Sequence, residues 1–575
     1  MAFRIACAGW WALVMMACSC AAENVAFSRP SAVVLPAESS IAFVANAGSG
    51  TVSGVDLVTG QIVSEAAIGG RLTDLVECPD RKLMLAVDNQ TRCVRLLRCD
   101  SQAVTEVQTL QLNDAPLRIA VSADGSMACV THQWASHVSL LQLNTAADGS
   151  TNVSLLGDLS VGFSQQCVAA LDDQQFIVAD RFRGQLAVVD AAAQAIVSES
   201  SLHGHNIRGL TVEPDGVHVL VAHQILSRVA RTSFDDVHWG MVMQNVVRRI
   251  PTADLLNAAA DVAKVGRVYR LGDTGEGFAD PTDVLASDGG FAVLSGGTNQ
   301  LMVMSWGGQV VARVATGVRP TRMIRTDASR FVVLNSLSDS VSVIWQGSDR
   351  RFYRLHTGAN APQPQSDVRS GEAAFYSAKL SHDGWMSCHS CHTDGHSPDL
   401  LADTLGDGAY GSPKRIPSLW GVADTGPWGW NGSMTALKNQ LQQTLTSTMH
   451  GDDHSPETIN SLVAYLHTLY PPASSHSADI WATRGKALFV SLDCIRCHKP
   501  GTWTSPQIYN VGLQDENGQS EFNPPSLRGV GFRNRYFHDG RATSIESVFR
   551  EFRHNLKTAL NEAQLRELTE FLNTL

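Results

Sequence analysis

The sequence predicts a multidomain chain in which an N-terminal all-β propeller of about seven blades precedes two all-α domains. Two observations carry this prediction. A strand–turn–strand unit recurs at intervals of roughly 40 residues from Ile41 onward, a spacing typical of propeller blades. Residues 371–575 contain the same series of sequence blocks twice. The 575-residue chain, with 44% hydrophobic and 17% charged residues, is long enough for several folded domains.

Residues 1–22 are typical of an export signal peptide. Arg4 provides a positive start, the apolar run Ala8–Ala17 follows, and small residues come next. Lipid attachment at Cys18 or Cys20 is an alternative, although the residues before them fit the lipidation motif poorly. The apolar run is too short for a transmembrane helix. We therefore expect a periplasmic or cell-surface protein with no transmembrane segment after signal removal.

The net charge of the chain bears on its binding partners, and its cysteines bear on the disulfides it could form. The net charge of −11 argues against nucleic acid as a partner. In an oxidising compartment, about one or two disulfides are compatible with the cysteines that lie outside the signal and the motifs described below. These cysteines are Cys78, Cys93, Cys99, Cys129 and Cys167.

The repeated unit of the N-terminal part is an apolar strand, a short polar turn and an alternating strand. Ala42–Asn46 with Thr51–Asp56 is one copy, and Phe176–Asp180 with Gln185–Asp190 is another. Period-2 alternation in short runs broken by Gly, Asn and Asp is typical of β-strands joined by tight turns. We expect the propeller within residues 31–355. Its copies begin near Ile41, Leu83, Met127, Phe176, Val217, Phe291 and Phe331.

The interval between the fifth and sixth copies is longer than the others. It predicts an insertion at about residues 230–270 that includes the helical-looking Thr252–Val262. The repeats resemble the YVTN-type propeller family in Phe43–Asn46 and Gly50–Val52. The histidines of this region are scattered and form no obvious ligand set. We therefore interpret the propeller as a partner-binding scaffold.

Two copies of Cys-x-x-Cys-His follow the propeller. This spacing lets two thiols add across the vinyl groups of one haem while the adjacent histidine ligates the iron. A single copy also occurs in redox and zinc sites, but two copies on an exported chain predict two covalently attached c-type haems. The residues are Cys388, Cys391 and His392 in the first copy, and Cys494, Cys497 and His498 in the second.

The two motifs head two similar modules, predicted at residues 371–472 and 478–575 after a linker at 356–370. Four blocks recur in the same order in both modules; Leu462–Leu466 in the first, for example, matches Leu568–Leu572 in the second. The closing blocks have the apolar spacing of a helix. We expect each module to be a small helical cytochrome c domain.

This tandem resembles the bacterial dihaem cytochrome c peroxidase and MauG superfamily, over residues 371–575 and not over the propeller. The resemblance implies that one haem stores or relays an electron and the other meets peroxide, with a tryptophan between them. Trp420 stands where that tryptophan is expected and is one catalytic candidate. The resemblance rests on Leu380–Gly384, Cys388–His392, Arg415–Leu419, Trp430–Gly432, Cys494–His498 and Tyr536–Ala542.

The first module departs from the family pattern at its acid–base groups, which peroxide chemistry needs near the distal oxygen. The resemblance implies a Gln and a Glu around the Trp430–Gly432 block, but Trp428 and Lys438 stand at those places. A switchable histidine of the family corresponds to about Asp407. In the second module Glu546 occupies the place of Lys438, which makes Glu546 the other catalytic candidate.

The distal ligands are the other open question. In small cytochromes c a methionine just before the last helix commonly closes the distal side of the haem. Met449 holds that place in the first module and His554 in the second, so both are candidate distal ligands. The competitors in the first module are Met434, His396 and His450.

Two functions compete. The first is a peroxidase or MauG-like oxidoreductase that passes electrons from a small electron-donor protein or cytochrome to hydrogen peroxide, or oxidises a partner protein presented by the propeller. The second is an electron-transfer or redox-sensing protein without peroxidase activity, in which both irons are six-coordinate. His538 is interpreted as structural, bonding a haem propionate together with Arg541.

Overall fold

The computed structural model describes residues 28–575, apart from 37–38, 80–81, 101–102, 147–149, 288, 328–329, 347–351, 359–365, 453, 475 and 477–478. The signal peptide expected at residues 1–22 and the middle of the expected linker lie outside the described residues. Within the described part of the chain, no helix combines the length and apolar character needed to cross a membrane.

Seven antiparallel sheets form the N-terminal part, which confirms the predicted seven-bladed propeller. Blades one to four contain β1 (Pro30–Val34), β2 (Ile41–Asn46), β3 (Thr51–Asp56), β4 (Ile62–Ala67), β5 (Leu72–Cys78), β6 (Leu83–Asp88), β7 (Cys93–Cys99), β8 (Val104–Gln111), β9 (Pro116–Val121), β10 (Met127–His132), β11 (His137–Thr145), β12 (Thr151–Ser160), β13 (Gln165–Ala170), β14 (Gln175–Asp180), β15 (Gln185–Asp190) and β16 (Ala195–Ser201). Blades five to seven contain β17 (His205–Val212), β18 (His218–Leu226), β19 (Met243–Pro251), β20 (Arg267–Asp273), β21 (Glu276–Gly277), β22 (Pro281–Ser287), β23 (Gly290–Ser295), β24 (Gln300–Ser305), β25 (Val310–Ala315), β26 (Pro320–Asp327), β27 (Arg330–Asn335), β28 (Ser340–Gln346) and β29 (Phe352–Gly358).

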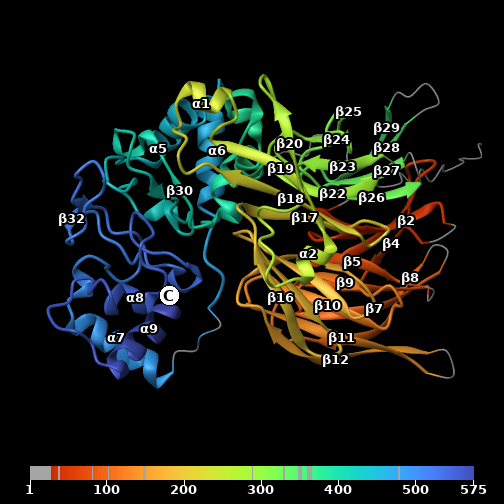
Figure 1. The fold of residues 1–575 in the computed structure, drawn as a ribbon, viewed down its shortest axis with the longest axis horizontal. Coiled ribbons are helices and arrows are strands. Elements are labelled where there is room, and N and C mark those ends of the chain that lie inside the picture. Colours follow the sequence, from red (N-terminus) through yellow and green to blue (C-terminus); the bar gives the residue numbers. More distant parts are fainter. Residues whose placement is uncertain are drawn as a thin grey trace, which may run out of the picture.

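The sequence repeat corresponds to the second and third strands of each blade. In blade one, Ile41 of β2 lies opposite Asp56 of β3, and Ala45 lies opposite Val52. Each blade is built from consecutive strands, and the first strand of each blade contacts the first strand of the next. Contacts between β26 and β1 close the ring (Figure 1).

The closure between blades one and seven, which we call the seam, is crossed by side chains outside the sheets. The backbone N–H of Arg29 donates to Asp339 Oδ1 at 2.8 Å, and the Arg29 guanidinium donates to both oxygens of Glu372 at 3.0 and 2.5 Å. Glu372 lies in α3 (Asp367–Phe375), and Arg369 of the same helix also donates to Asp339. The first helix after the propeller therefore ties the two ends of the ring together.

Residues 230–270 are not one protruding insertion, as the sequence had led us to expect. β19 lies in their middle and pairs with β18 and β20 as a central strand of blade five, because its apolar side chains are buried in the blade. Two short helices flank it, α1 (Phe234–His238) and α2 (Thr252–Leu256). α2 ends earlier than predicted because Asn257 adopts an extended backbone.

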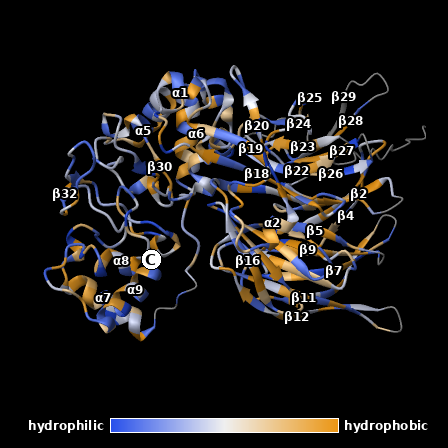
Figure 2. Ribbon diagram, in the orientation of Figure 1, coloured by the Kyte–Doolittle hydropathy of each residue, from blue (hydrophilic) through white to orange (hydrophobic). Residues whose placement is uncertain are grey.

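The C-terminal part is helical and divides into a first module (residues 366–469) and a second module (residues 479–575). Figure 2 shows hydrophobic residues along the strands of the blades and on α7 to α9. The first module contains α3, α4 (Cys388–Cys391), β30 (Leu401–Ala402), β31 (Lys414–Arg415), α5 (Leu437–Gln443) and α6 (Pro456–Leu466). The second contains α7 (Ile480–Ser491), β32 (Tyr509–Asn510), β33 (Glu521–Phe522), α8 (Ile545–Arg550) and α9 (Glu562–Asn573).

Each module packs its first helix across its last, α3 on α6 and α7 on α9. A glycine lies at each crossing. A Cβ atom on Gly371 would lie 1.8 Å from the Ser461 carbonyl oxygen, and one on Gly485 would lie 1.8 Å from the Glu567 carbonyl oxygen. Only glycine allows the two backbones to approach this closely. The two modules therefore share one packing arrangement.

The first module lies against one face of the propeller, and its haem-attachment segment is buried there (Figure 1). Ser390 Oγ donates to Asp280 Oδ1 at 2.6 Å, and Ser387 donates to the other oxygen of that carboxylate. His205 Nε2 donates to the Ser390 carbonyl oxygen at 2.8 Å. His205 begins β17 of blade five and Asp280 directly precedes β22 of blade six, so contacts from these two blades fix the position of this segment relative to the propeller.

The described cysteines are all free thiols. The disulfides that the sequence allowed among the propeller cysteines are therefore not formed. Four of these five residues are buried: Cys78, Cys93, Cys129 and Cys167. Burial raises the pKa of the Cys99 thiol to about 11, so this half-buried thiol is also neutral near pH 7.

Candidate haem sites

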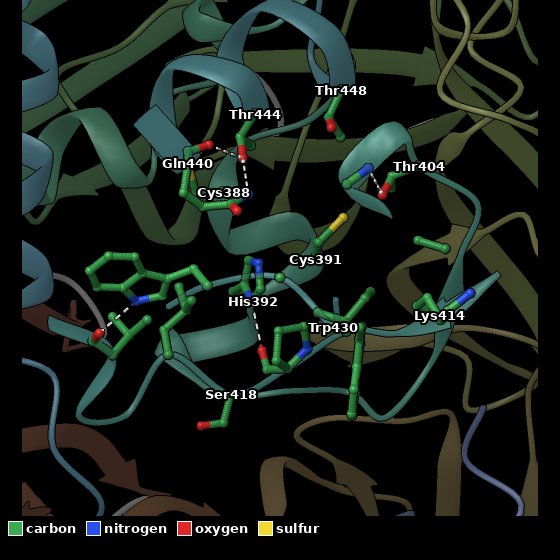
Figure 3. A pocket seen from close by; sticks show the side chains of 18 of the residues that line it. Cys388, Cys391, His392, Thr404, Lys414, Ser418, Trp430, Gln440, Thr444 and Thr448 are labelled. Carbon is green, nitrogen blue, oxygen red and sulfur yellow. Dashed lines mark hydrogen bonds between the residues drawn. The ribbon is translucent and has the colours of Figure 1, made fainter. Parts of the chain in front are cut away.

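A cavity of about 320 Å³ lies in the first module where it borders the propeller and the second module, and Cys388, Cys391 and His392 line it (Figure 3). The short helix α4 brings both sulfur atoms to this cavity. Burial raises the pKa of both thiols to about 12, which keeps them protonated.

The second module contains a smaller cavity of about 140 Å³, lined by Cys494, Cys497 and His498. Each of the two Cys-x-x-Cys-His motifs thus opens into its own cavity. The lining is mainly apolar and includes Phe489, Val548 and other side chains of the second module. An apolar cavity with a cysteine pair and a histidine suits a flat, largely apolar macrocycle.

The two motif histidines are held in the same way. His392 Nδ1 lies 3.0 Å from the Pro417 carbonyl oxygen, and His498 Nδ1 lies 3.2 Å from the Trp503 carbonyl oxygen. A carbonyl oxygen only accepts, so the Nδ1 atom carries the proton and Nε2 keeps its lone pair for a metal. Burial lowers the pKa of both rings to about 4, so both are neutral at pH 7.

The two cavities share a wall. Trp430 belongs to this wall, where its Nε1–H donates to the Arg415 carbonyl oxygen at 2.9 Å. The Arg415 guanidinium lies 5.4 Å from the centre of the Trp430 ring and pairs with Asp399 at 3.2 Å. A single layer of side chains therefore separates the two cavities. The wall consists of Arg415, Trp430, Asn523, Pro524, Pro525 and Arg533.

Trp420, the sequence-based candidate for the tryptophan between the haems, lines the first cavity and is only 5% exposed. It stacks on His396 with ring centres 3.8 Å apart and meets Phe532 of the second module edge-on at 5.8 Å. Trp134 of the propeller packs against it at 5.4 Å. Trp420 thus contacts all three parts of the molecule, whereas Trp430, named from the sequence only as part of a family block, lies in the shared wall.

Met449 and His554, the candidate distal ligands, each line the cavity of their own module. Met449 follows a π-helical turn, Thr444–Thr448, and is 3% exposed. π-Helical turns are frequent at functional sites because they shift the side chains that follow. His554 packs against Phe537 with ring centres 5.5 Å apart, and burial lowers its pKa. A neutral histidine has a lone pair available for iron.

Two competitors of Met449 have their ring nitrogens engaged elsewhere. His396 Nδ1 lies 2.9 Å from Ser418 Oγ, and its Nε2 lies 3.4 Å from the Phe532 carbonyl oxygen. His450 Nε2 donates to the Thr232 carbonyl oxygen of the propeller at 2.9 Å. His396, His450 and the third competitor, Met434, are not among the described residues that line the first cavity, whereas Met449 is, which leaves Met449 as the stronger candidate.

The polar lining of the first cavity comes partly from residues that sequence reasoning missed. Gln440, Thr444 and Thr448 lie on one side of it, supplied by α5 and the π-helical turn (Figure 3). The Gln440 side-chain oxygen is buried without a partner, as is that of Gln443. The signal available in the sequence was the polar run Lys438–Thr448 on a helix that also carries apolar residues.

Acid–base groups are placed differently in the two modules. In the first cavity the lining carboxylate is Asp407, whose Oδ2 lies 3.0 Å from Lys414 Nζ. Lys438 is exposed, and Trp428 lines the cavity but donates its Nε1–H to the Val422 carbonyl oxygen at 2.8 Å. Glu546, in the first turn of α8, is not among the described residues that line the second cavity.

His538 supports the fit of a haem in the second cavity. It lines that cavity, is 1% exposed and stacks on Phe522 at 4.3 Å, yet neither ring nitrogen has a hydrogen-bond partner, and Nε2 lies 4.0 Å from Asp539 Oδ2. Buried polar atoms without a partner are uncommon and indicate a missing hydrogen-bonding group. A haem carboxylate would supply one. Arg541, expected beside His538, instead pairs with Asp539 at 2.5 Å.

Comparison with known proteins gives the same assignment. The family described as di-haem cytochrome c peroxidase matches residues 365–473. The C-terminal part of the chain is thus similar to the dihaem cytochrome c peroxidase and MauG superfamily. Methylamine utilization protein MauG of Methylorubrum extorquens is 26% identical over 285 residues, covering 38% of this chain and 80% of that protein.

Two further relatives match the same share of the chain. Cytochrome c551 peroxidase of Nitrosomonas europaea is 22% identical over 275 residues, covering 38% of this chain and 82% of the peroxidase. Hydrazine synthase subunit gamma of Kuenenia stuttgartiensis is 24% identical over 283 residues, covering 38% of this chain and 79% of that subunit. The family implies covalently bound c-type haem, and the cysteine pairs, neutral histidines and unpartnered His538 nitrogens fit such a group.

Proposed function

We propose that this protein is an exported oxidoreductase with two c-type haems, one in each helical module, that passes electrons between them and delivers them to hydrogen peroxide. The observation that carries the proposal is the shared wall, because one layer of side chains separates two cavities that each contain a Cys-x-x-Cys-His motif. A haem bound in each cavity would supply a one-electron redox centre.

The chain's own residues define how each centre is held. Cys388 and Cys391 would anchor one haem and Cys494 and Cys497 the other, while His392 and His498 would offer Nε2 to the iron. Pro417 and Trp503 fix the tautomer of those histidines through their carbonyl oxygens. Each module is then a cytochrome c domain.

The segment between the second pair of cysteines indicates where electrons arrive. Arg496 is exposed, whereas the corresponding segment of the first module is buried against the propeller. A small electron-donor protein or cytochrome can therefore approach the second module more closely than the first. The propeller acts as the scaffold that holds the first module and leaves the second one accessible.

Reduction of peroxide to two water molecules consumes two electrons and two protons, and the protons need a route into the first cavity. Asp407 and Lys414 form the ionisable pair on its wall. Gln440 and Thr444 supply an amide and a hydroxyl that can orient a bound oxygen species. Asp407→Asn should lower peroxide turnover by roughly 100-fold or more, with haem content unchanged. An equal loss of haem would assign Asp407 a structural role.

A second function is favoured by a specific observation. Met449 and His554 line the cavities, and if both bind iron the two centres are six-coordinate and only transfer electrons. Electron paramagnetic resonance of the ferric protein followed by mixing with peroxide separates the two functions. A high-spin haem that consumes peroxide supports the oxidoreductase. Two low-spin haems that peroxide leaves unchanged exclude peroxidase activity and leave electron transfer.

A further inference from the structure

A cluster of two histidines and one aspartate lies at the junction of the propeller and the first module. His238 comes from α1 of the propeller, and His382 and Asp383 come from the turn before the first haem motif. His238 Nδ1 lies 3.0 Å from His382 Nε2 and 3.1 Å from Asp383 Oδ2. His382 Nε2 lies 3.4 Å from that same oxygen. One ligand atom from each residue thus forms a nearly equilateral triangle.

The edges of this triangle match one face of a tetrahedral metal site. Zinc binds imidazole nitrogen and carboxylate oxygen at about 2.0–2.1 Å, which places neighbouring ligands of a tetrahedron about 3.3 Å apart. The three observed distances of 3.0, 3.1 and 3.4 Å bracket that value. If the three side chains were joined only by hydrogen bonds, two of the three distances between their ligand atoms would need to be short, whereas here all three are.

Neighbouring groups hold the three side chains in position. The Gly275 N–H donates to Asp383 Oδ2 at 3.0 Å, and Trp385 Nε1–H donates to the His238 carbonyl oxygen at 3.2 Å. Phe234 stacks on the His238 ring with an interplanar angle of 6° and also contacts the His382 ring at 4.7 Å. Outer contacts of this kind orient ligands for a metal.

The cluster is reachable from solvent without being fully exposed. The side chains of His238, His382 and Asp383 are 33%, 23% and 16% exposed. An ion can therefore reach the triangle, and the solvent side leaves its fourth position open to water. Imidazole ligands favour zinc and related transition metals over calcium and magnesium, which take oxygen ligands.

We propose that His238, His382 and Asp383 bind one divalent transition-metal ion of the zinc class and so join the propeller to the first module. This site is additional to the two haem irons and does not depend on the proposed redox function. The ion would lie next to the first cavity. The backbone N–H of His382 donates to the carbonyl oxygen of Met449 at 2.8 Å, and Met449 lines that cavity. Metal binding would therefore fix the backbone that carries the candidate distal ligand.

Titration of the full-length haem-loaded protein, without a histidine tag, with Zn²⁺ alone tests the proposal. We expect one zinc ion per chain by calorimetry, and zinc-edge X-ray absorption showing two imidazole nitrogens and an oxygen shell. Zinc should also raise the thermal unfolding midpoint, because it binds the folded state. His238→Gln and Asp383→Asn should each weaken binding more than about tenfold, since loss of outer-shell partners alone costs roughly 10–100-fold.

His218→Gln is the matched control, because His218 also lies near a carboxylate, with its Nδ1 3.5 Å from Glu213, but has no second histidine beside it in the described structure. This variant should bind zinc like the unmodified protein. Absence of zinc binding by the unmodified protein would overturn the proposal. So would unchanged affinity in His238→Gln and Asp383→Asn, because the ion would then lie elsewhere. A correctly folded state of each variant follows from an unchanged haem content and absorption spectrum.

Discussion

The two Cys-x-x-Cys-His segments have the same motif but opposite surroundings. In the first, His389 and Ser390 between the cysteines are 4% and 0% exposed, buried against the propeller. In the second, Ile495 is half-buried and Arg496 is exposed. Haem attachment uses the cysteines and the final histidine and leaves the two intervening residues free. The comparison shows that those free positions carry the docking contacts of the first module.

The modules also differ in what holds them. Asp394, just after the first motif, accepts from Arg181 at 2.8 Å and Arg208 at 2.7 Å, both from the propeller. The second module is attached through the first by ion pairs such as Arg528–Asp424 at 2.6 Å. The first module is therefore docked directly on the propeller, and the second module packs against the first through partly exposed pairs such as Arg528–Asp424 and buried ones such as Lys414–Asp515.

Removal of either cysteine pair should have the largest effect. Cys388→Ser with Cys391→Ser, or Cys494→Ser with Cys497→Ser, should leave one covalent haem instead of two, because each pair anchors one haem. Mass spectrometry of the intact protein measures the haem number. If either double variant retained both haems, the cysteine pair removed in that variant would not anchor a haem.

Truncation of the distal candidates comes next. If Met449 binds iron, Met449→Ala should convert the haem of the first module from low spin to high spin, because the sixth ligand is lost. His554→Ala should do the same for the second module. Electron paramagnetic resonance of the ferric forms detects each change separately. A spectrum unchanged in either variant would remove that residue from the ligand set.

Asp394→Ala should destabilise the docked first module by about 3–5 kcal/mol, because it leaves two buried guanidinium groups without their carboxylate. Although burial acts in the opposite direction, Arg208 and Arg181 hold the pKa of Asp394 well below its usual range. Urea denaturation measures the loss. Asp493→Ala in the second module is the control: Asp493 also has a positive φ, 61° against 51° for Asp394, but its side chain is 67% exposed, so a loss of at most about 1 kcal/mol is expected. If both variants lost the same free energy of unfolding, Asp394 would not dock the first module on the propeller as proposed.

Asp424→Asn should have the smallest effect, at most about 1 kcal/mol, because exposed ion pairs contribute little. The hydrogen bond from Arg528 lowers the pKa of Asp424 below its ordinary value of 3.8. The contribution is therefore complete above pH 3.8 and is lost as the pH falls through the lower folded value. Stability measured between pH 7 and pH 3 in both proteins should converge at the acid end.

Much of the fold could be predicted because it rests on local patterns. The alternating strands that began near Ile41 and Phe331 are β2 and β27, and the helix expected after Asn561 is α9, capped by that residue. The expected insertion was wrong because β19 belongs to a long hairpin whose spacing departs from the repeat. Sequence spacing does not show whether extra residues leave a sheet or extend it.

The candidate sites were predictable only where the chemistry is adjacent in sequence. Cysteines and histidines within five residues specify haem attachment, and position before the last helix identified Met449 and His554. The shared wall could not be predicted, because Arg415 and Arg533 reach it from distant segments and different modules. The same is true of Asp280, whose carboxylate meets the first haem segment across more than one hundred residues of chain.

The seam of the propeller gives the haem region a second role. Blades one and seven share no strand. The seam between them is therefore closed by side-chain packing and by residues outside the sheets that contact both blades. Two residues of α3 contact the two sides of the seam: Glu372 accepts from Arg29, and Arg369 donates to Asp339. Helix α3, which begins the first module, thus also closes the ring. Separation of blades one and seven would require these contacts of α3 to break first.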